Sequence, residues 1–281
     1  MMFRNVVAVF ALLMVLTGCS SFSVDERRAK ASKIAAEGNL APLVVATRSF
    51  MLQGFWRLQA QPEYPTVYIE GDGLAFVSGR PSFNPTPRNP VALRLAAVDQ
   101  SADVIYLGRP CQYVDLKKEG NCQSKYWTSH RYSKEIVEAY ETVLDNLKRQ
   151  AGVGGYHLVG FSGGGAIATL LAAKRDDILS LKTVAGNLDI VQHSNLHKVK
   201  QLHGSLNPAD YVRDLRHMPQ RHLVGGKDDN VPPVIAESFV AKQGAENCAF
   251  IRMVPNASHN KGWESIWREE HRRNAGCRNK F

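Results

Sequence analysis

The chain has 281 residues, of which 44% are hydrophobic and 22% are charged, and its 35 Lys and Arg against 26 Asp and Glu give a formal net charge of +9. These proportions are typical of a globular protein and exclude a disordered, collagen-like or multi-span membrane chain. Its 22 Gly and 13 Pro follow no repeat of about 20 to 50 residues, which argues against solenoids and propellers.

The first 18 residues have the pattern of a cleaved export signal. A positive charge precedes the apolar run Val6–Leu16, which is too short to cross a bilayer and has the length of a signal-peptide core. Thr17 and Gly18 stand directly before Cys19, and this boundary resembles the lipobox of bacterial lipoproteins. The resemblance implies cleavage before Cys19 and lipids on Cys19. A plain secretory signal with an incidental cysteine is the alternative, and both interpretations predict export.

We therefore expect a lipidated tether and N-terminal segment over residues 19–40, followed by one domain over residues 41–281. A multiply acylated cysteine anchors firmly, because each buried methylene adds about 0.8 kcal/mol. Ser20 rather than Asp follows Cys19, which in lipoproteins of this kind suggests the outer membrane, facing the periplasm. The membrane is thus an expected partner. Nucleic acid is not, since the basic residues are scattered without interleaved aromatic side chains.

Four cysteines remain when Cys19 is set aside, and an even number suits disulfides in an oxidising compartment. The pairing is open from sequence alone. We favour Cys111 with Cys122, which closes a short polar loop, and Cys248 with Cys277, which ties the chain end to a late strand. No CxxC spacing is present, so the cysteines predict no metal site.

Apolar runs alternate with helical patterns along residues 41–281, which predicts an α/β fold with a mostly parallel central sheet and helices on both faces. An antiparallel pair of strands is expected within Leu43–Arg57. The other predicted strands are Thr66–Glu70, Val104–Leu107, Tyr156–Phe161, Leu181–Ala185, His222–Val224 and Phe250–Val254. The predicted helices are Asn89–Asp99, Ser133–Gln150, Ala166–Lys174, one from Pro232 to Lys242, and Trp263–Arg273. Residues 192–217 show little periodicity and are expected to form an inserted cap or a long loop.

Residues 156–166 predict a strand, a sharp turn and a helix, with G-x-S-x-G at Gly160, Ser162 and Gly164. The pattern alone is a weak signal, but a nucleophilic serine needs glycines on either side of such a turn, because strand and helix approach closely there. The N–H groups that begin the helix point at the same place, and Gly163 is expected to supply one of them to an oxyanion. A phosphate-binding turn is the alternative, but no Lys-Ser/Thr pair follows as in a P-loop.

A serine nucleophile requires a base and an orienting carboxylate. Asp228 follows a predicted strand at the carboxyl edge of the sheet, and His259 lies on a loop after the last strand. The order Ser162, Asp228, His259 resembles the α/β-hydrolase family over nearly all of the mature chain. The resemblance implies the α/β-hydrolase fold and a Ser-His-Asp triad. Asp229, which is adjacent, and Asp189, where some members carry their acid, are alternatives to Asp228.

Two positions depart from that family's usual pattern. Ser258 precedes the histidine where glycine is common, and Glu70 stands where members often carry the His of His-Gly-x-Gly. The glycines at Gly71 and Gly73 permit a close backbone approach, so the backbone N–H of Asp72 is the expected second oxyanion donor. A tight turn with no catalytic role is the alternative.

The sequence therefore predicts a lipid-anchored serine hydrolase that cleaves an ester, thioester or amide through an acyl-enzyme, with a carboxylic ester preferred. The expected partner besides the membrane is a small-molecule or peptide acyl substrate, and no cofactor or metal is required. His193 and His197 have helical spacing but lack the Glu of HExxH, so zinc is not expected. A serine peptidase of the same fold and a catalytically silent lipoprotein scaffold are the alternatives.

Overall fold

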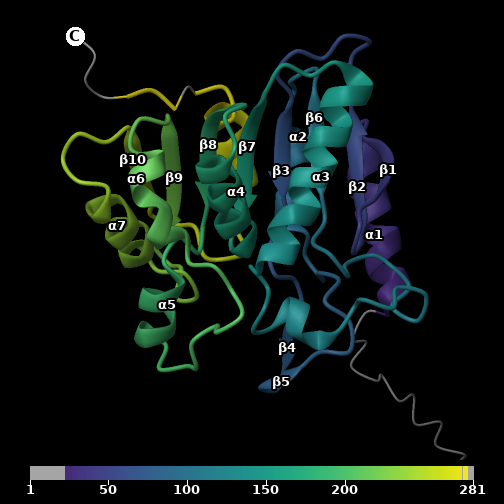
Figure 1. The fold of residues 1–281 in the computed structure, drawn as a ribbon, viewed down its shortest axis with the longest axis horizontal. Helices are drawn as coiled ribbons and strands as arrows, with labels where there is room; N and C mark the ends of the chain where they lie inside the picture. The colour runs from purple at the N-terminus through teal and green to yellow at the C-terminus, as the bar shows by residue number, and fades with distance from the viewer. Residues whose placement is uncertain (1–22, 274, 278–281) are drawn as a thin grey trace, which may run out of the picture.

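The structure, a computed structural model, describes residues 23–273 and 275–277 (Figure 1). The predicted signal peptide, residues 1–18, and the predicted lipidation site, Cys19, lie outside the described residues. In the part of the chain that is described, no helix is long and apolar enough to cross a membrane.

An eight-stranded sheet runs through the centre of the molecule in the order β1-β2-β6-β3-β7-β8-β9-β10. Its strands are β1 (Ala41–Ala46), β2 (Met51–Arg57), β3 (Thr66–Ile69), β6 (Val104–Leu107), β7 (Tyr156–Phe161), β8 (Ile178–Val184), β9 (Gln220–Gly225) and β10 (Ala249–Val254). Strand β2 is antiparallel to both β1 and β6, and the other neighbours are parallel. The predicted mostly parallel sheet with an antiparallel opening pair is confirmed.

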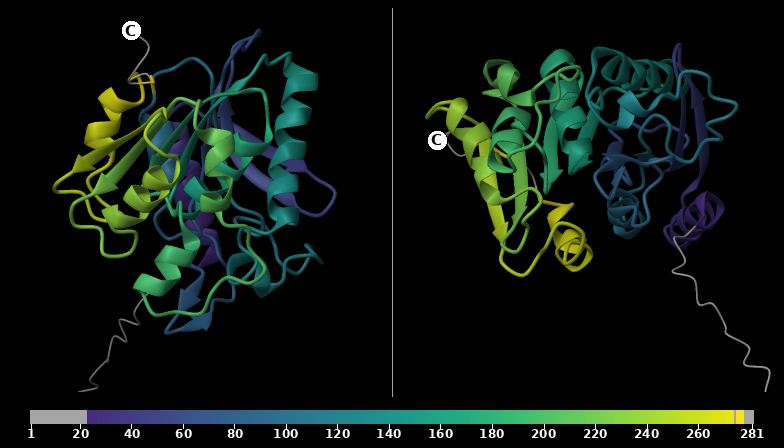
Figure 2. Two further views of the ribbon diagram at one scale, coloured as in Figure 1. Left: turned by 60° about the vertical axis from the view of Figure 1, so that its left-hand side comes forward. Right: turned by 90° about the horizontal axis from the view of Figure 1, so that it is seen from below.

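Helices cover both faces of this sheet, as the sequence predicted (Figure 2, right). One face carries α3 (Lys134–Ala151), α4 (Gly163–Lys174), α6 (Val212–Leu215) and α7 (Pro233–Lys242). The other carries α1 (Val24–Glu37), α2 (Val91–Val98) and α8 (Glu264–Glu270). Strand β3 has apolar side chains on both faces of the sheet, and each face needs a cover. Val67 and Ile69 pack on the first face and Tyr68 packs on the second, and all three are fully buried. A strand covered on both faces is apolar throughout.

Helix α1 was not predicted, although its sequence carries a start signal. Ser23 and Glu26 form a capping box, in which the serine side chain accepts from the Glu26 N–H and the Glu26 carboxylate accepts from the Ser23 N–H. Ala31 and Ala35 are buried in the same hydrophobic cluster as α2. The predicted tether and N-terminal segment, residues 19–40, thus contains a helix that packs on the sheet.

Two further segments differ from the predictions. Residues 192–217 are not a structureless loop: they contain the end of α5 (Ile190–Leu196), a short 3-10 helix at Pro208–Tyr211, and α6. Helices of four to seven residues are too short to show a period in sequence. The hairpin of β4 (Phe76–Val77) and β5 (Arg80–Pro81) was also missed, because each strand has only two residues. A second 3-10 helix spans Ser124–Trp127.

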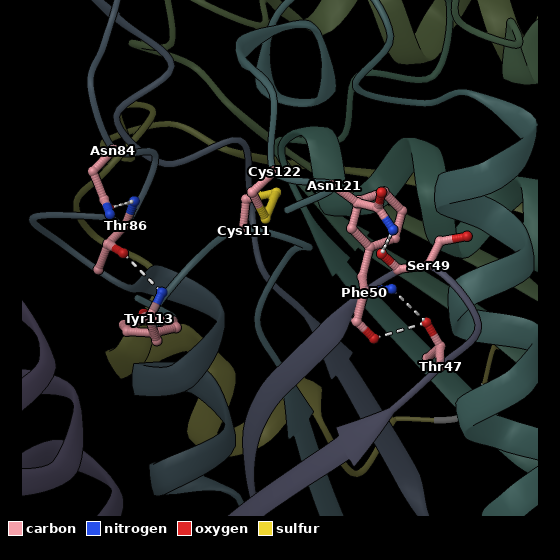
Figure 3. Close-up of a disulfide and its surroundings, with 9 residues drawn as sticks. All are labelled: Thr47, Ser49, Phe50, Asn84, Thr86, Cys111, Tyr113, Asn121 and Cys122. Atoms are coloured by element: carbon pink, nitrogen blue, oxygen red, sulfur yellow. Dashed lines mark hydrogen bonds between the residues drawn. A yellow bond between two sulfur atoms is a disulfide. The ribbon is translucent and has the colours of Figure 1, made fainter. Parts of the chain in front are cut away.

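Two disulfides are present, and they join Cys111 to Cys122 and Cys248 to Cys277, the pairs favoured from the sequence. The first closes the loop that follows β6 (Figure 3).

Candidate active site

Ser162 lies at the turn between β7 and α4, with φ at +52° and ψ at −120°. A positive φ is uncommon for a residue other than glycine and marks a strained turn. A Cβ on Gly160 would collide with the backbone of Gly164 and Gly165, which shows how closely strand and helix approach. Helix α4 begins at Gly163 and not at Ala166 as predicted, so the serine precedes the first helical turn directly.

Ser162, His259 and Asp228 form one hydrogen-bonded chain. His259 Nε2 lies 3.0 Å from Ser162 Oγ, and His259 Nδ1 lies 2.9 Å from Asp228 Oδ2. The second carboxylate oxygen, Oδ1, accepts the backbone N–H groups of Asn230 at 3.0 Å and Val231 at 2.9 Å, which fixes the orientation of the carboxylate. Since a carboxylate only accepts, Nδ1 carries the imidazole proton and Nε2 faces the hydroxyl as an acceptor.

The two alternative acids lie elsewhere. Asp189 is buried and accepts from Ser238 Oγ at 2.8 Å, from Lys242 Nζ at 2.6 Å and from the Gln192 N–H at the start of α5. Burial acts to raise the pKa of Asp189, but the hydrogen bonds from Lys242 and its other partners outweigh it and hold that pKa below its ordinary value. Asp229 is exposed. Asp228 is therefore the carboxylate that the fold places against His259.

Gly163 and Asp72 lie against each other beside Ser162. Gly163 begins α4, and a Cβ at this glycine would collide with the carboxylate of Asp72, so the loop after β3 lies directly against it. Within residues 23–273 and 275–277, neither the Gly163 nor the Asp72 backbone N–H donates a hydrogen bond. These are the two positions that the sequence predicted as oxyanion donors.

Three residues outside the predicted site hold the Asp72 carboxylate. Its Oδ1 accepts from Arg109 at 2.9 Å, and its Oδ2 accepts from Arg131 at 2.8 Å and from the Tyr132 hydroxyl at 2.9 Å. Burial acts to raise the pKa of Asp72, but the positive charges of Arg131 and Arg109 outweigh it and hold that pKa below its usual value. The available signal for Arg109 was its position directly after β6, at the carboxyl edge of the sheet.

Glu70, the residue at the position of the family's histidine, lies beneath this loop. Its carboxylate accepts the N–H groups of Gly71 at 2.9 Å and Ala92 at 3.3 Å, and the hydroxyl of Tyr106 at 3.1 Å. It therefore ties the loop to the N-terminal end of α2, where a negative charge is favourable. Burial nevertheless raises the pKa of Glu70 to about 7.

The disulfide loop, whose Tyr113 contacts Thr86 in Figure 3, also contacts the backbone of this region. Gln112 Nε2 donates to the Gly71 carbonyl at 3.0 Å, and the Tyr113 N–H donates to Thr86 Oγ1 at 2.7 Å. Cys111 and Tyr113 have φ values of +70° and +62°, so the backbone here is strained and kept in place by its surroundings. The loop thus helps to hold Gly71 and Asp72 in place.

A cleft of about 900 Å³ opens over the serine. Side chains of Ser162 and His259 contribute to its lining together with the aromatic rings of Phe76 and Phe161. Four basic side chains also line it, namely Arg88, Arg94, Arg131 and Lys261. Among the described residues, no group of three or more His, Cys, Asp or Glu side chains is arranged to hold a metal ion.

The sequence matches no protein-family model and no curated protein. The fold is nevertheless similar to several solved structures. The esterase Pf2001 of Pyrococcus furiosus superimposes with a TM-score of 0.60 at 12% identity, covering 84% of this chain and 92% of that one. An α/β serine hydrolase homologue from Coxiella burnetii superimposes with a TM-score of 0.57 at 17% identity, covering 82% of this chain and 94% of that one. Acylaminoacyl peptidase of Pyrococcus horikoshii superimposes with a TM-score of 0.58 at 11% identity, covering 82% of this chain but only 39% of that one.

These similarities show that the chain has the α/β-hydrolase fold, as its sequence resemblance implied.

Proposed function

We propose that the protein is a serine hydrolase that cleaves a carboxylic ester and that is held at the bacterial outer membrane by lipids on Cys19. The observation that carries the proposal is the hydrogen-bonded chain from Ser162 through His259 to Asp228, at the base of an open cleft. Structural neighbours that are named esterases and serine hydrolases support the same class of chemistry.

The proposed reaction begins with attack of Ser162 Oγ on the carbonyl carbon while His259 Nε2 takes the hydroxyl proton. The imidazolium that forms is stabilised by Asp228, and the oxyanion accepts from the N–H groups of Gly163 and Asp72. Collapse of the tetrahedral intermediate breaks the bond to the leaving group, which receives the proton from His259. A water molecule, deprotonated by His259, then cleaves the acyl-serine ester and releases the acid and the free Ser162 hydroxyl.

The choice between ester and amide is the finer part of the proposal. The triad geometry serves both, and one structural neighbour is named an acylaminoacyl peptidase. That neighbour is matched over only 39% of its length, whereas the esterase is matched over 92% of its own. We therefore propose an ester as the substrate and keep an amide as the competing outcome.

Covalent labelling tests the reaction class. A fluorophosphonate probe is expected to label the protein, peptide mapping to place the label on Ser162, and Ser162→Ala to abolish labelling. The same variant is expected to lose on the order of 10³ to 10⁶ in turnover of p-nitrophenyl acetate, because the triad acts as a unit. Turnover equal to that of the parent would rule the proposal out. Faster release from matched p-nitroanilides than from esters would make the protein an amidase.

The lipid anchor requires a separate test. Expression of the full chain in a bacterium fed labelled palmitate is expected to give a labelled membrane-associated protein, and Cys19→Ser is expected to remove the label. Labelling retained in Cys19→Ser would refute the anchor without affecting the proposed chemistry.

A further inference from the structure

The start of helix α1 lies beside the catalytic cleft. Arg27 donates to the carbonyl oxygens of Asn84 and Thr86, and Lys30 donates to the Arg88 carbonyl at 2.9 Å. Arg88 is one of the residues that line the cleft. These hydrogen bonds hold the first turns of α1 against the segment that borders the cleft.

The position of the proposed lipid follows from this arrangement. Only residues 20–22 separate Cys19 from Ser23, the N-cap of α1. A fully extended chain advances by at most about 3.5 Å per residue, so a linker of this length reaches no further than about 14 Å from Ser23. A membrane anchored at Cys19 is therefore held near the start of α1, the end of this helix that contacts the segment bordering the cleft.

Exposed apolar side chains stand on both sides of the cleft at this end of the molecule. On one side, the β4–β5 hairpin and the residues after it expose Val77 at 47% and Phe83 at 100%. On the other side, Val199 follows α5 and is 56% exposed. Helix α5 is joined to the cleft by His193, whose Nε2 lies 2.9 Å from the carbonyl oxygen of Asn230. Figure 1 shows the hairpin and α5 together at the lower end of the molecule.

Exposed cations accompany these apolar groups. Arg80 lies in the hairpin, and Lys198 and Lys200 flank Val199. Within the described part of the chain, none of the three forms an ion pair. Apolar side chains combined with unpaired cations are typical of surfaces that bind anionic bilayers. We call Val77, Arg80, Phe83, Lys198, Val199 and Lys200 the cleft rim.

We propose that the cleft rim docks on an anionic lipid bilayer, so that the cleft opens at the level of the headgroups and takes its acyl substrate from that surface. The apolar side chains enter the headgroup region and the cations bind lipid phosphates. The statements about the substrate and about the lipid on Cys19 rest on the proposed function, whereas the apolar and basic residues of the cleft rim support the docking without it.

Vesicle flotation tests the docking without help from the lipid anchor. The chain from Ser20 onward, exported under a cleavable leader, contains every residue that the structure describes. It is expected to float with vesicles of phosphatidylcholine and phosphatidylglycerol, and less with phosphatidylcholine alone or at high salt. Phe83→Ser combined with Val77→Ser is expected to weaken binding by about tenfold or more, because two apolar side chains no longer enter the interface. Arg80→Ser and Lys198→Ser are each expected to weaken it by about fivefold.

Matched controls come from the opposite end of the sheet. Leu179 is 41% exposed at the amino end of β8, and Lys174 is exposed at the end of α4. Leu179→Ser and Lys174→Ser are expected to leave flotation unchanged. The proposal would be overturned if the Val77→Ser, Phe83→Ser double variant floated as well as Leu179→Ser. It would also be overturned if the parent showed no preference for anionic vesicles.

A parallel assay with soluble p-nitrophenyl acetate separates the two proposals. Every rim variant is expected to keep the parent's rate on this substrate, while the rate on a phospholipid ester in vesicles falls with flotation. Absence of ester hydrolysis together with rim-dependent flotation would refute the proposed function alone. Hydrolysis of the soluble ester without flotation would refute the docking alone.

Discussion

Replacement of Asp72 by Asn tests whether a buried ion pair holds the oxyanion loop. The change keeps the shape of the side chain but removes the charge that Arg109 and Arg131 contact at 2.9 and 2.8 Å. The two arginine side chains are only 5% and 18% exposed, so they lose their counter-charge in a largely dry site. Removing one partner of a buried ion pair lowers the free energy of unfolding by about 3 to 5 kcal/mol. We expect a loss of about 3 kcal/mol here, because the Asn oxygen still accepts one hydrogen bond.

The same substitution is expected to lower kcat. The Asp72 backbone N–H is a proposed oxyanion donor, and the substitution keeps this N–H but loosens the loop that positions it. Complete loss of one such donor costs on the order of 10² to 10³ in kcat, which is the upper limit of the expected effect. KM is expected to change little, since the interaction forms in the transition state. Urea denaturation gives the stability change, and p-nitrophenyl acetate turnover at a temperature where both proteins stay folded gives the kinetic change.

An exposed ion pair provides the control. Asp25 lies 2.9 Å from Arg28, the same separation as Asp72 from Arg109, but it is 88% exposed. Asp25→Asn is expected to cost less than about 1 kcal/mol and to leave kcat unchanged. A stability loss in Asp72→Asn with an unchanged kcat would show that the pair is structural only. Unchanged stability would refute the ion-pair reasoning itself.

Three other predictions concern the same region. Asp228→Asn is expected to lower kcat on the order of 10⁴-fold, because it removes the acceptor that fixes the imidazole tautomer. Asp229→Asn is expected to leave kcat unchanged, and a larger loss of kcat in Asp229→Asn than in Asp228→Asn would make Asp229 the triad acid. Glu70 has a folded-state pKa of about 7, well above its ordinary value, so its protonated form favours folding. As the pH rises from about 4.5 to 7, the parent is therefore expected to lose on the order of 3 kcal/mol of stability relative to Glu70→Gln. Urea denaturation at several pH values measures this difference, and parallel pH profiles of the two proteins would contradict it. Replacing both Cys111 and Cys122 by Ser is expected to cost about 3 kcal/mol and to reduce kcat, because the loop that holds Gly71 loosens; a stability loss at full kcat would separate the disulfide from the site.

Features that depend on neighbouring residues could be predicted from the sequence. The parallel strands of the central sheet were found because such strands form apolar runs, and α3 was found because its buried residues recur at helical spacing. The positions of Gly160 and Gly164 on either side of Ser162 indicated the nucleophile turn, because a tight strand-to-helix turn leaves no room for a Cβ there. Short elements escaped, since two-residue strands such as β4 and β5 contain no period.

The sequence by itself determined which residues have the chemistry for the site, namely a serine in a glycine-flanked turn, a late histidine and a set of candidate acids. It favoured Asp228 but left Asp189 open as an alternative, because each follows a strand at the same edge of the sheet. Only the tertiary structure separates them: Lys242 and Ser238 surround Asp189, whereas Asp228 faces His259. The ion pairs of Asp72 with Arg109 and Arg131 could likewise not be predicted from the sequence. The paired residues are 37 and 59 positions apart, so the contacts depend on how strands and loops pack in space and leave no local pattern.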